Sequence, residues 1–190
     1  EDDSRLCLAI VHFLPERLGK RLLKEVIGPL KKADPDQYYL PKESLHLTIQ
    51  NVKAIMNEKK CKEEHFTSDD IKKVEGLEDF FAKNNKFEFE LDGLFMMPES
   101  IGLRCYPTKE TTRFILALRK KLEEIGVPDN KVYMDPKVVI GNVTLCRFYK
   151  KPNPRFLEIF DKIRGVKLGK LSIGNVHLIT SNFVCHPSHT

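Results

Sequence analysis

The sequence predicts an α+β fold built from two related halves. In each half an apolar run typical of a strand precedes an amphipathic helix, and a second strand then alternates polar and apolar residues. The alternating strands begin at His46 and Asn142, which are 142 − 46 = 96 positions apart, and the elements before them are offset by nearly the same amount. Many α/β chains repeat the order strand, helix, strand, but a polar pair repeated at one offset is typical of an internal duplication.

The first half begins with an apolar run at residues 6–11, which predicts a strand. A helix is expected at about residues 16–30, because apolar residues recur there at helical spacing. These residues are Leu18, Leu22, Leu23, Val26, Ile27 and Leu30. The alternating strand His46–Ile49 completes this half.

The second half repeats these elements in the same order. Residues 101–106 predict its first strand, and a helix is expected from about Lys109 to Ile125. The apolar stripe of this helix consists of Phe114, Ile115, Leu118, Leu122 and Ile125. The strand Asn142–Leu145 then takes the place of His46–Ile49.

Shorter elements are predicted outside the two units. Residues 54–67 are rich in Lys and Glu and are interpreted as an exposed loop. The other expected elements are a helix from Ser68 or Asp69 to Ala82, a strand at 86–92 that Gly93 ends, a turn at Pro98, a helix near 156–163 and a strand near 176–179. His177, in the last strand, has two interpretations, a residue facing a site or a solvated or core histidine.

The two alternating strands each present a polar face. Successive side chains of a strand point to opposite faces, so His46 and Thr48 share one face, as do Asn142 and Thr144. Arg147, at the end of the second strand, is expected to return to the polar face. Two such strands facing each other would form a polar cleft.

Composition fits one ordinary globular domain, or two small and intimately packed lobes, over residues 1–190, and we expect a single domain. With 41% hydrophobic and 31% charged residues, the chain has enough apolar material for a core without disulfide or metal. No apolar run approaches the roughly 20 residues that a membrane span requires, and the N-terminal residues do not resemble a signal peptide. We expect a monomeric cytoplasmic protein that has no cofactor and does not bind membranes.

The cysteine pattern gives no sign of a metal or redox site. The five cysteines include no C-x-x-C pair, which is typical of small buried hydrophobes in a reducing compartment. Cys185, His186 and His189 lie together at the C-terminus and are interpreted as a polar tail, so no metal ligand is assigned.

The charge of the chain favours a polyanionic ligand. The formal net charge is +5 and the pI is near 8.9, both mild for a protein that wraps nucleic acid. Basic residues concentrate at Lys53, Lys59, Lys60 and Lys62 and again at Arg147, Lys150 and Lys151. Solvated loops and contacts with a phosphate backbone both remain open as interpretations of these clusters.

Two segments together resemble a known family. Residues 39–49, YLPKESLHLTI, and residues 142–147, NVTLCR, resemble the two motifs of the 2H phosphoesterases. The branch they resemble is that of bacterial 2'-5' RNA ligases and RNA 2',3'-cyclic phosphodiesterases. The order of elements matches from about Leu6 to Ile179, but Asn142 replaces the second motif's histidine and Gly141 replaces its usual proline.

The resemblance implies a bilobal α+β fold with pseudo-twofold symmetry, in which two small antiparallel sheets flanked by helices surround a central cleft. The lobe carrying the first motif would span about residues 5–95 and the other about 96–180, with strands able to exchange between lobes. The implied ligand is RNA or a nucleotide with a 2',3'-cyclic phosphate or a 2'-5' linkage. The implied chemistry is metal-independent phosphodiester transfer, in which one imidazole acts as base and another as acid.

The resemblance also assigns residues to the site. His46, Thr48, Asn142 and Thr144 occupy the catalytic positions, and the threonine hydroxyls would hold the phosphate. Arg147 would stabilise charge on the phosphoryl oxygens. Tyr39, seven positions before His46, is either a platform for a nucleobase or an aromatic of the core or lobe interface.

Asn142 decides how far function can be argued from the sequence. A carboxamide forms hydrogen bonds but does not titrate near neutral pH, so it cannot transfer a proton. An engineered change, natural divergence of the proton transfer, and loss of catalysis each explain it, and Gly141 favours natural divergence.

Three hypotheses for function follow. The first is a phosphodiesterase of RNA processing, a hydrolase that acts on RNA ends or small nucleotides and is impaired by Asn142. The second is a non-catalytic module that binds nucleotides or RNA on the same scaffold. The third is an unrelated α/β protein, in which His46 and Thr144 would be buried on opposite sides of a core.

Overall fold

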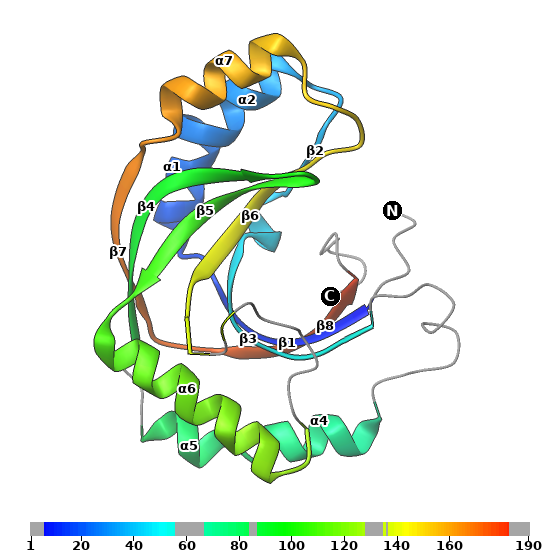
Figure 1. The fold of residues 1–190 in the computed structure, drawn as a ribbon, viewed down its shortest axis with the longest axis vertical. Coiled ribbons are helices and arrows are strands. Elements are labelled where there is room, and N and C mark those ends of the chain that lie inside the picture. The colour runs from blue at the N-terminus through cyan, green and yellow to red at the C-terminus, as the bar shows by residue number, and fades with distance from the viewer. Residues whose placement is uncertain (1–5, 56–66, 84–86, 128–134, 136, 183–190) are drawn as a thin grey trace.

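Two antiparallel sheets form the centre of the molecule, and helices pack at both ends (Figure 1). The structure is a computed structural model that describes residues 6–55, 67–83, 87–127, 135 and 137–182. Residues 59, 60 and 62 of the first basic cluster, most of the expected loop at 54–67, and the tail residues Cys185, His186 and His189 lie outside this range. Within the described residues, no helix is both long and apolar enough to cross a bilayer.

The first sheet has three strands in the order β3-β1-β8. They are β1 (Leu6–Phe13), β3 (His46–Ile55) and β8 (His177–Asn182). Strand β1 pairs antiparallel with both neighbours, which places Val11 opposite Thr48 on one side and His177 on the other. The first motif therefore lies on an edge strand of a sheet that the C-terminal strand completes.

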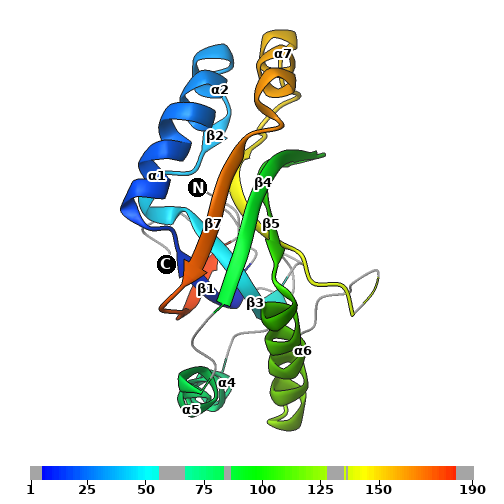
Figure 2. The ribbon, with the colours of Figure 1, turned by 90° about the vertical axis from the view of Figure 1, so that its left-hand side faces the viewer.

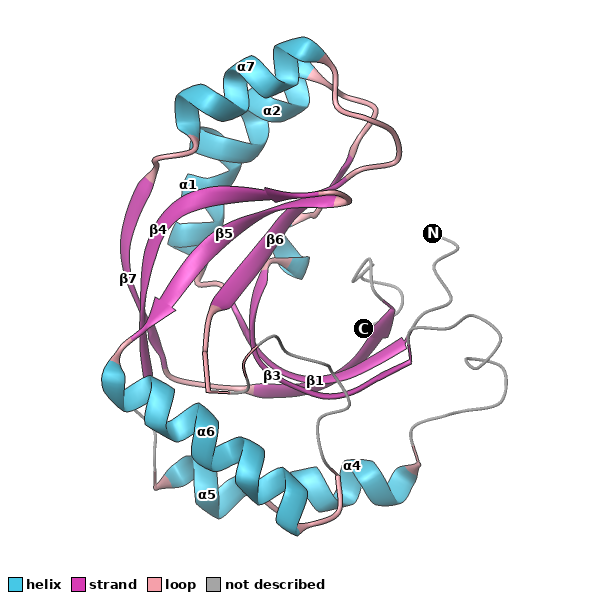
Figure 3. Cartoon of the chain, viewed as in Figure 1, coloured by secondary structure: helices cyan, strands magenta, loops and turns pink. Residues whose placement is uncertain are grey.

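The second sheet has five strands in the order β2-β6-β5-β4-β7, all antiparallel where they pair. They are β2 (Tyr38–Tyr39), β4 (Phe87–Met97), β5 (Ser100–Pro107), β6 (Gly141–Arg147) and β7 (Lys167–Ile173). Strand β6 carries the second motif, and it runs close to β3 where the two sheets meet (Figure 3).

Helices cover the two ends of this assembly. Helices α2 and α7 lie side by side at one end, and α4, α5 and α6 lie at the other (Figure 2). Their bounds are α1 (Glu16–Leu22), η1 (Leu23–Ile27), α2 (Gly28–Ala33), η2 (Lys42–Ser44), α4 (Ser68–Glu75), α5 (Glu78–Ala82), α6 (Lys109–Glu124) and α7 (Pro154–Ile163). One continuous buried core joins the helices to both sheets.

The helix expected at residues 16–30 is present and contains a π turn. Segment η1 is π-helical, and the N–H of Gly28 bonds to the carbonyl of Leu23, five residues earlier. Pro29 follows and has no N–H to donate to the carbonyl four residues before it. The wider turn lets the chain pass this proline and continue to Ala33.

The strands of the two halves pair in the same way. In each half a helix follows the first strand in the sequence, and the motif strand then pairs antiparallel with that first strand. These pairs are β1 with β3 and β5 with β6. The α+β fold with two antiparallel sheets is confirmed. Strands pass between the halves, because β4 lies in the second sheet and β8 in the first.

Two elements differ from expectation, and strand β7 was not expected. The helix expected up to Ala82 is broken at Gly76 and Leu77, and its N-cap is Thr67, whose hydroxyl accepts a hydrogen bond from the N–H of Asp70. Strand β4 continues through Gly93 to Met97, because Gly93 adopts a φ of 78° in a bulge instead of ending the strand. Strand β7 was not expected, because its outward side is polar and its apolar residues are few.

The two motif strands meet in tight core packing at Gly141. A Cβ at this position would lie 2.7 Å from Cδ1 of Leu47 in β3 and 3.2 Å from Cε1 of Phe89 in β4. Both neighbours are fully buried side chains that have little room to move. A larger residue at position 141 would therefore have to displace Leu47.

Gly141→Ala is expected to destabilise the protein by about 1–3 kcal/mol, because an added methyl overpacks the contact between the two sheets. Urea unfolding followed by circular dichroism measures the change. Gly165→Ala is the matched control, since a Cβ at Gly165 meets nothing within 4 Å. Equal unfolding midpoints for the two variants would show that this contact is not tight.

Candidate active site

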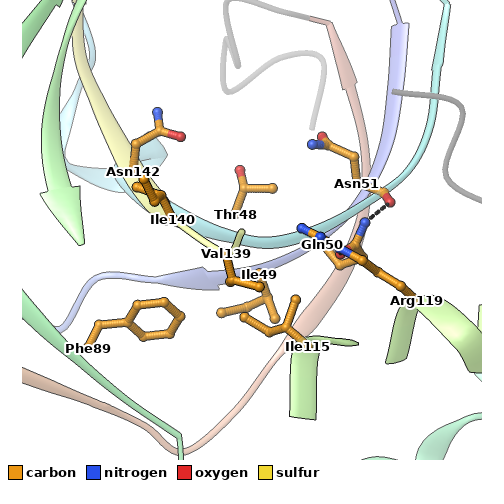
Figure 4. Close-up of a pocket in the computed structure, with 11 residues that line it drawn as sticks. Thr48, Ile49, Gln50, Asn51, Phe89, Ile115, Arg119, Val139, Ile140 and Asn142 are labelled. Carbon is orange, nitrogen blue, oxygen red and sulfur yellow. Dashed lines mark hydrogen bonds between the residues drawn. The ribbon is translucent and has the colours of Figure 1, made fainter. Parts of the chain in front are cut away.

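One polar residue of each motif lines a shared pocket between the sheets, whereas His46, Thr144 and Arg147 are not among its lining residues (Figure 4). Thr48 from β3 and Asn142 from β6 both line it, and their side chains point to the same side of the ribbon. His46, Thr48, Asn142 and Thr144 are all partly exposed, whereas Leu47 and Val143 between them are fully buried. In both strands the polar residues therefore lie on the partly exposed face, and the apolar residues between them lie in the core.

Strand β3 does not alternate strictly beyond Thr48. Its register with β1 shifts twice, which leaves Ile49 and Val52 without a partner as bulges. The shift at Ile49 returns Asn51 to the face of Thr48, and Asn51 points into the same space as Thr48 and Asn142 (Figure 4). Strict alternation would have put Asn51 on the other face, so the sequence did not single it out.

His46 is held in one tautomer by the backbone. Its Nδ1–H donates a hydrogen bond of 2.8 Å to the carbonyl of Ser44, so Nε2 keeps its lone pair when the ring is neutral. The edge of Phe13, its partner in β1, packs against the imidazole with ring centroids 6.1 Å apart. The ring is thereby oriented from two sides.

The surroundings of His46 favour its neutral form. Burial lowers the pKa of His46 below the usual 6.5, because an imidazolium loses its hydration there. The Ser44 carbonyl opposes this shift, and the positive charge of Arg147 adds to it. At neutral pH His46 is therefore ready to accept a proton rather than to donate one.

Arg147 reaches the polar face through a bulge. Thr144 and Arg147 are three residues apart, so strict alternation would put them on opposite faces. The register of β5 and β6 shifts at Leu145, which has no partner residue in β5, and Arg147 then lies opposite Ser100 on the face of Thr144. The expected position of Arg147 was right, but a bulge produces it and alternation does not.

Tyr39 lies in β2, and its neighbour Tyr38 lies nearer the polar face. The register places Tyr39 opposite Cys146 and Tyr38 opposite Arg147, so Tyr38 shares the face of Arg147. The Tyr39 hydroxyl donates a 2.7 Å hydrogen bond to the Asp34 carbonyl, and burial raises the pKa of the phenol. The stacking of a base on Tyr39 stays a prediction.

A helix residue also reaches the pocket. Arg119 of α6 donates a 2.9 Å hydrogen bond from Nε to the side-chain carbonyl of Gln50, and both residues line the pocket with Asn142 (Figure 4). The helical pattern of the sequence gave no reason to separate Arg119 from the other basic residues of α6.

His177 lies on the same face of the first sheet as Thr48, since both lie opposite Val11. It is exposed, and its ring contacts Phe13 with centroids 5.3 Å apart. Phe13 therefore stands between His177 and His46. In the part of the chain that the structure describes, no three His, Cys, Asp or Glu side chains are grouped as metal ligands would be.

Solved structures share the fold of this chain at low sequence identity. The protein TT0787 of Thermus thermophilus aligns with a TM-score of 0.54 and 17% identity over 93% of this chain and 86% of its own. A protein described as a phosphoesterase aligns with a TM-score of 0.51 and 13% identity over 93% and 94% of the two chains. LigT of E. coli, a 2'-5' RNA ligase solved in complex with ATP, aligns with a TM-score of 0.50 and 11% identity over 93% and 95%.

The chain has the 2H phosphoesterase fold. No protein-family model and no curated protein matches its sequence. Strand β3 carries His46 and strand β6 carries Asn142, the two residues that the sequence resemblance places at the start of the two motifs.

Proposed function

We propose that this protein is a metal-independent phosphodiesterase that opens 2',3'-cyclic phosphates, or cleaves 2'-5' linkages, at RNA ends or in small nucleotides. The observation that supports this most strongly is the state of His46, a neutral imidazole with a fixed tautomer, two residues before Thr48 on the strand whose Thr48 lines a pocket with Asn142. The fold shared with a phosphoesterase and with LigT supports the same reaction class.

The proposed mechanism uses His46 as the general base. Nε2 removes a proton from a water molecule as the water oxygen attacks phosphorus, and the bond to one ribose oxygen breaks. Thr48, Thr144 and the amide of Asn142 donate hydrogen bonds to the phosphoryl oxygens, and Arg147 balances their charge. Asn142 cannot protonate the leaving oxygen, so water supplies that proton.

The direct test is hydrolysis of a nucleoside 2',3'-cyclic phosphate by the purified protein, followed by separation of the monophosphate products. Turnover above the buffer rate supports the phosphodiesterase. A wild-type rate equal to that of buffer, with fresh protein and no added metal, would exclude this substrate class.

The pH dependence of the reaction is expected to have a single limb. The rate should rise with pH as His46 loses its proton, with a midpoint below 6.5 because burial lowers that pKa. Above this midpoint the rate should stay level through neutral pH, because no second imidazole has to remain protonated. Initial rates between about pH 4.5 and 9 measure the profile, and a bell shape would reveal a second titrating group that acts as acid.

Asn142 favours one other function. The carboxamide of Asn142 shares a strand face with Thr144 and a pocket with Thr48, and it can bind phosphate oxygens without transferring a proton. The site therefore also suits a non-catalytic module that binds nucleotides or RNA. Binding of nucleoside monophosphates without turnover, weakened in Thr48→Ala and Thr144→Ala, would support the module. Undiminished binding in both variants would exclude it.

A further inference from the structure

Arg104 lies beside Asn142 on the second sheet. The register places Arg104 of β5 directly opposite Asn142 of β6, so both side chains rise from the same face with Cα atoms about 5 Å apart. Thr144 lies opposite Gly102 in the next pair on that face. The polar face that carries the second motif therefore continues from β6 onto β5.

The guanidinium of Arg104 has no anionic partner among the described residues. Its Nε is buried without a hydrogen-bond partner, and no described carboxylate lies within salt-bridge distance of its charge. The side chain leans toward β4, where a Cβ on Gly93 would lie 2.6 Å from Nη2. Only the bulged glycine with its φ of 78° leaves room for the guanidinium at this point.

An aromatic ring lies next to Arg104 on the same face of the second sheet. Phe95 of β4 pairs with Gly102, and a Cβ on Gly102 would lie 2.7 Å from both Cε1 and Cζ of the Phe95 ring. The ring thus crosses β5 over a residue without a side chain, toward Thr144 on β6. Phe95 is partly exposed although neighbouring Leu94 is buried.

Arg104 and Phe95 suit the two parts of a nucleotide, its phosphate and its base. Guanidinium groups bind phosphate through two parallel hydrogen bonds. A flat aromatic ring in a charged groove stacks on any nucleobase. An apolar ring alone, or a cation alone, would be ordinary on a sheet surface, but here both adjoin the strand of Asn142 and Thr144.

We propose that Arg104 and Phe95 form a nucleotide subsite in which the nucleoside that bears the reactive phosphate stacks on Phe95 and its 5'-phosphate binds Arg104. This inference rests on the proposed function and deepens it. A nucleotide that carries a 2',3'-cyclic phosphate and also a 5'-phosphate is the 3'-terminal residue of an RNA chain. The preferred ligand is therefore an RNA 3' end, and a free cyclic mononucleotide fills only part of the site.

The test compares binding of adenosine 3'-phosphate and adenosine 3',5'-bisphosphate by isothermal titration calorimetry, which needs no turnover. Wild type is expected to bind the bisphosphate about 10- to 100-fold more tightly. Arg104→Ala should remove this preference and leave binding of the monophosphate unchanged. Arg104→Lys, which keeps the charge but loses the two-pronged contact, should restore part of it.

Two further variants complete the experiment. Phe95→Leu should weaken both nucleotides about tenfold while leaving the affinity for inorganic phosphate unchanged. Arg113→Ala removes an equal charge from an exposed position on α6 and should change neither affinity. Thermal melting of each variant confirms that it is folded.

The outcomes separate the subsite from the function. Equal wild-type affinities for the two nucleotides, or an equal effect of Arg104→Ala and Arg113→Ala, would overturn the subsite while the phosphodiesterase stands. Failure of wild type to bind either nucleotide would overturn the proposed function and the subsite with it.

Discussion

Asn142→His is expected to raise the rate of cyclic phosphate opening by about 10² to 10⁴, the usual contribution of one general acid or base. The new imidazole would lie in the pocket that Thr48 also lines, because Asn142 is partly exposed and is one of its lining residues. There it can give a proton to the leaving ribose oxygen, which water supplies in the wild type. The change is measured as kcat with a nucleoside 2',3'-cyclic phosphate.

The pH profile of the same variant gives a second readout. An imidazole that must be protonated adds a falling limb on the alkaline side, so the single-limbed profile should become bell-shaped. Asn51→His is the matched control, since Asn51 is also partly exposed and points into the same space from β3. If both variants keep the wild-type rate and profile, the second motif position takes no part in the reaction.

His46→Ala is expected to lower the wild-type rate by about 10² to 10⁴, or to the buffer rate, because His46 supplies the base. The same substitution should leave the binding of inorganic phosphate within about threefold of wild type, since the hydroxyls, Asn142 and Arg147 remain. Initial rates and calorimetry measure the two effects separately.

His177→Ala provides the control for His46→Ala. His177 lies on the same sheet face and contacts the other side of Phe13, but it is exposed. We expect its loss to change the rate by less than about threefold, because it lacks the buried setting that prepares His46 as a base. A large loss of rate in His177→Ala with little loss in His46→Ala would show that the general base is His177 of β8 and not His46.

The sequence predicted the paired motif strands because alternation is a local property. His46 and Thr48 lie within one strand, and so do Asn142 and Thr144, so their shared faces follow from spacing alone. The repeated offset then predicted that the two strands occupy equivalent places in the fold. The pairing of β1 with β3 and of β5 with β6 agrees with that prediction.

The details that the sequence could not predict depend on a partner strand. The bulges at Ile49 and Leu145 arise where the register of two strands shifts, and no property of either residue marks the shift. They decide the face of Asn51, which lines the pocket, and the face of Arg147, which it shares with Thr144. Phe95 and Arg104 were missed for a related reason, since each depends on a glycine in a neighbouring strand, Gly102 and Gly93.

The contact at Gly141 limits how the protein can move. Leu47 of the first sheet and Phe89 of the second both pack closely against Gly141. The two motif strands are therefore in contact through the buried core. A hinge that swung the halves apart would have to open this close-packed layer, which protein interiors resist. Ligands should therefore enter a cleft whose width is already set, and single-molecule or relaxation measurements should show no lobe opening coupled to turnover.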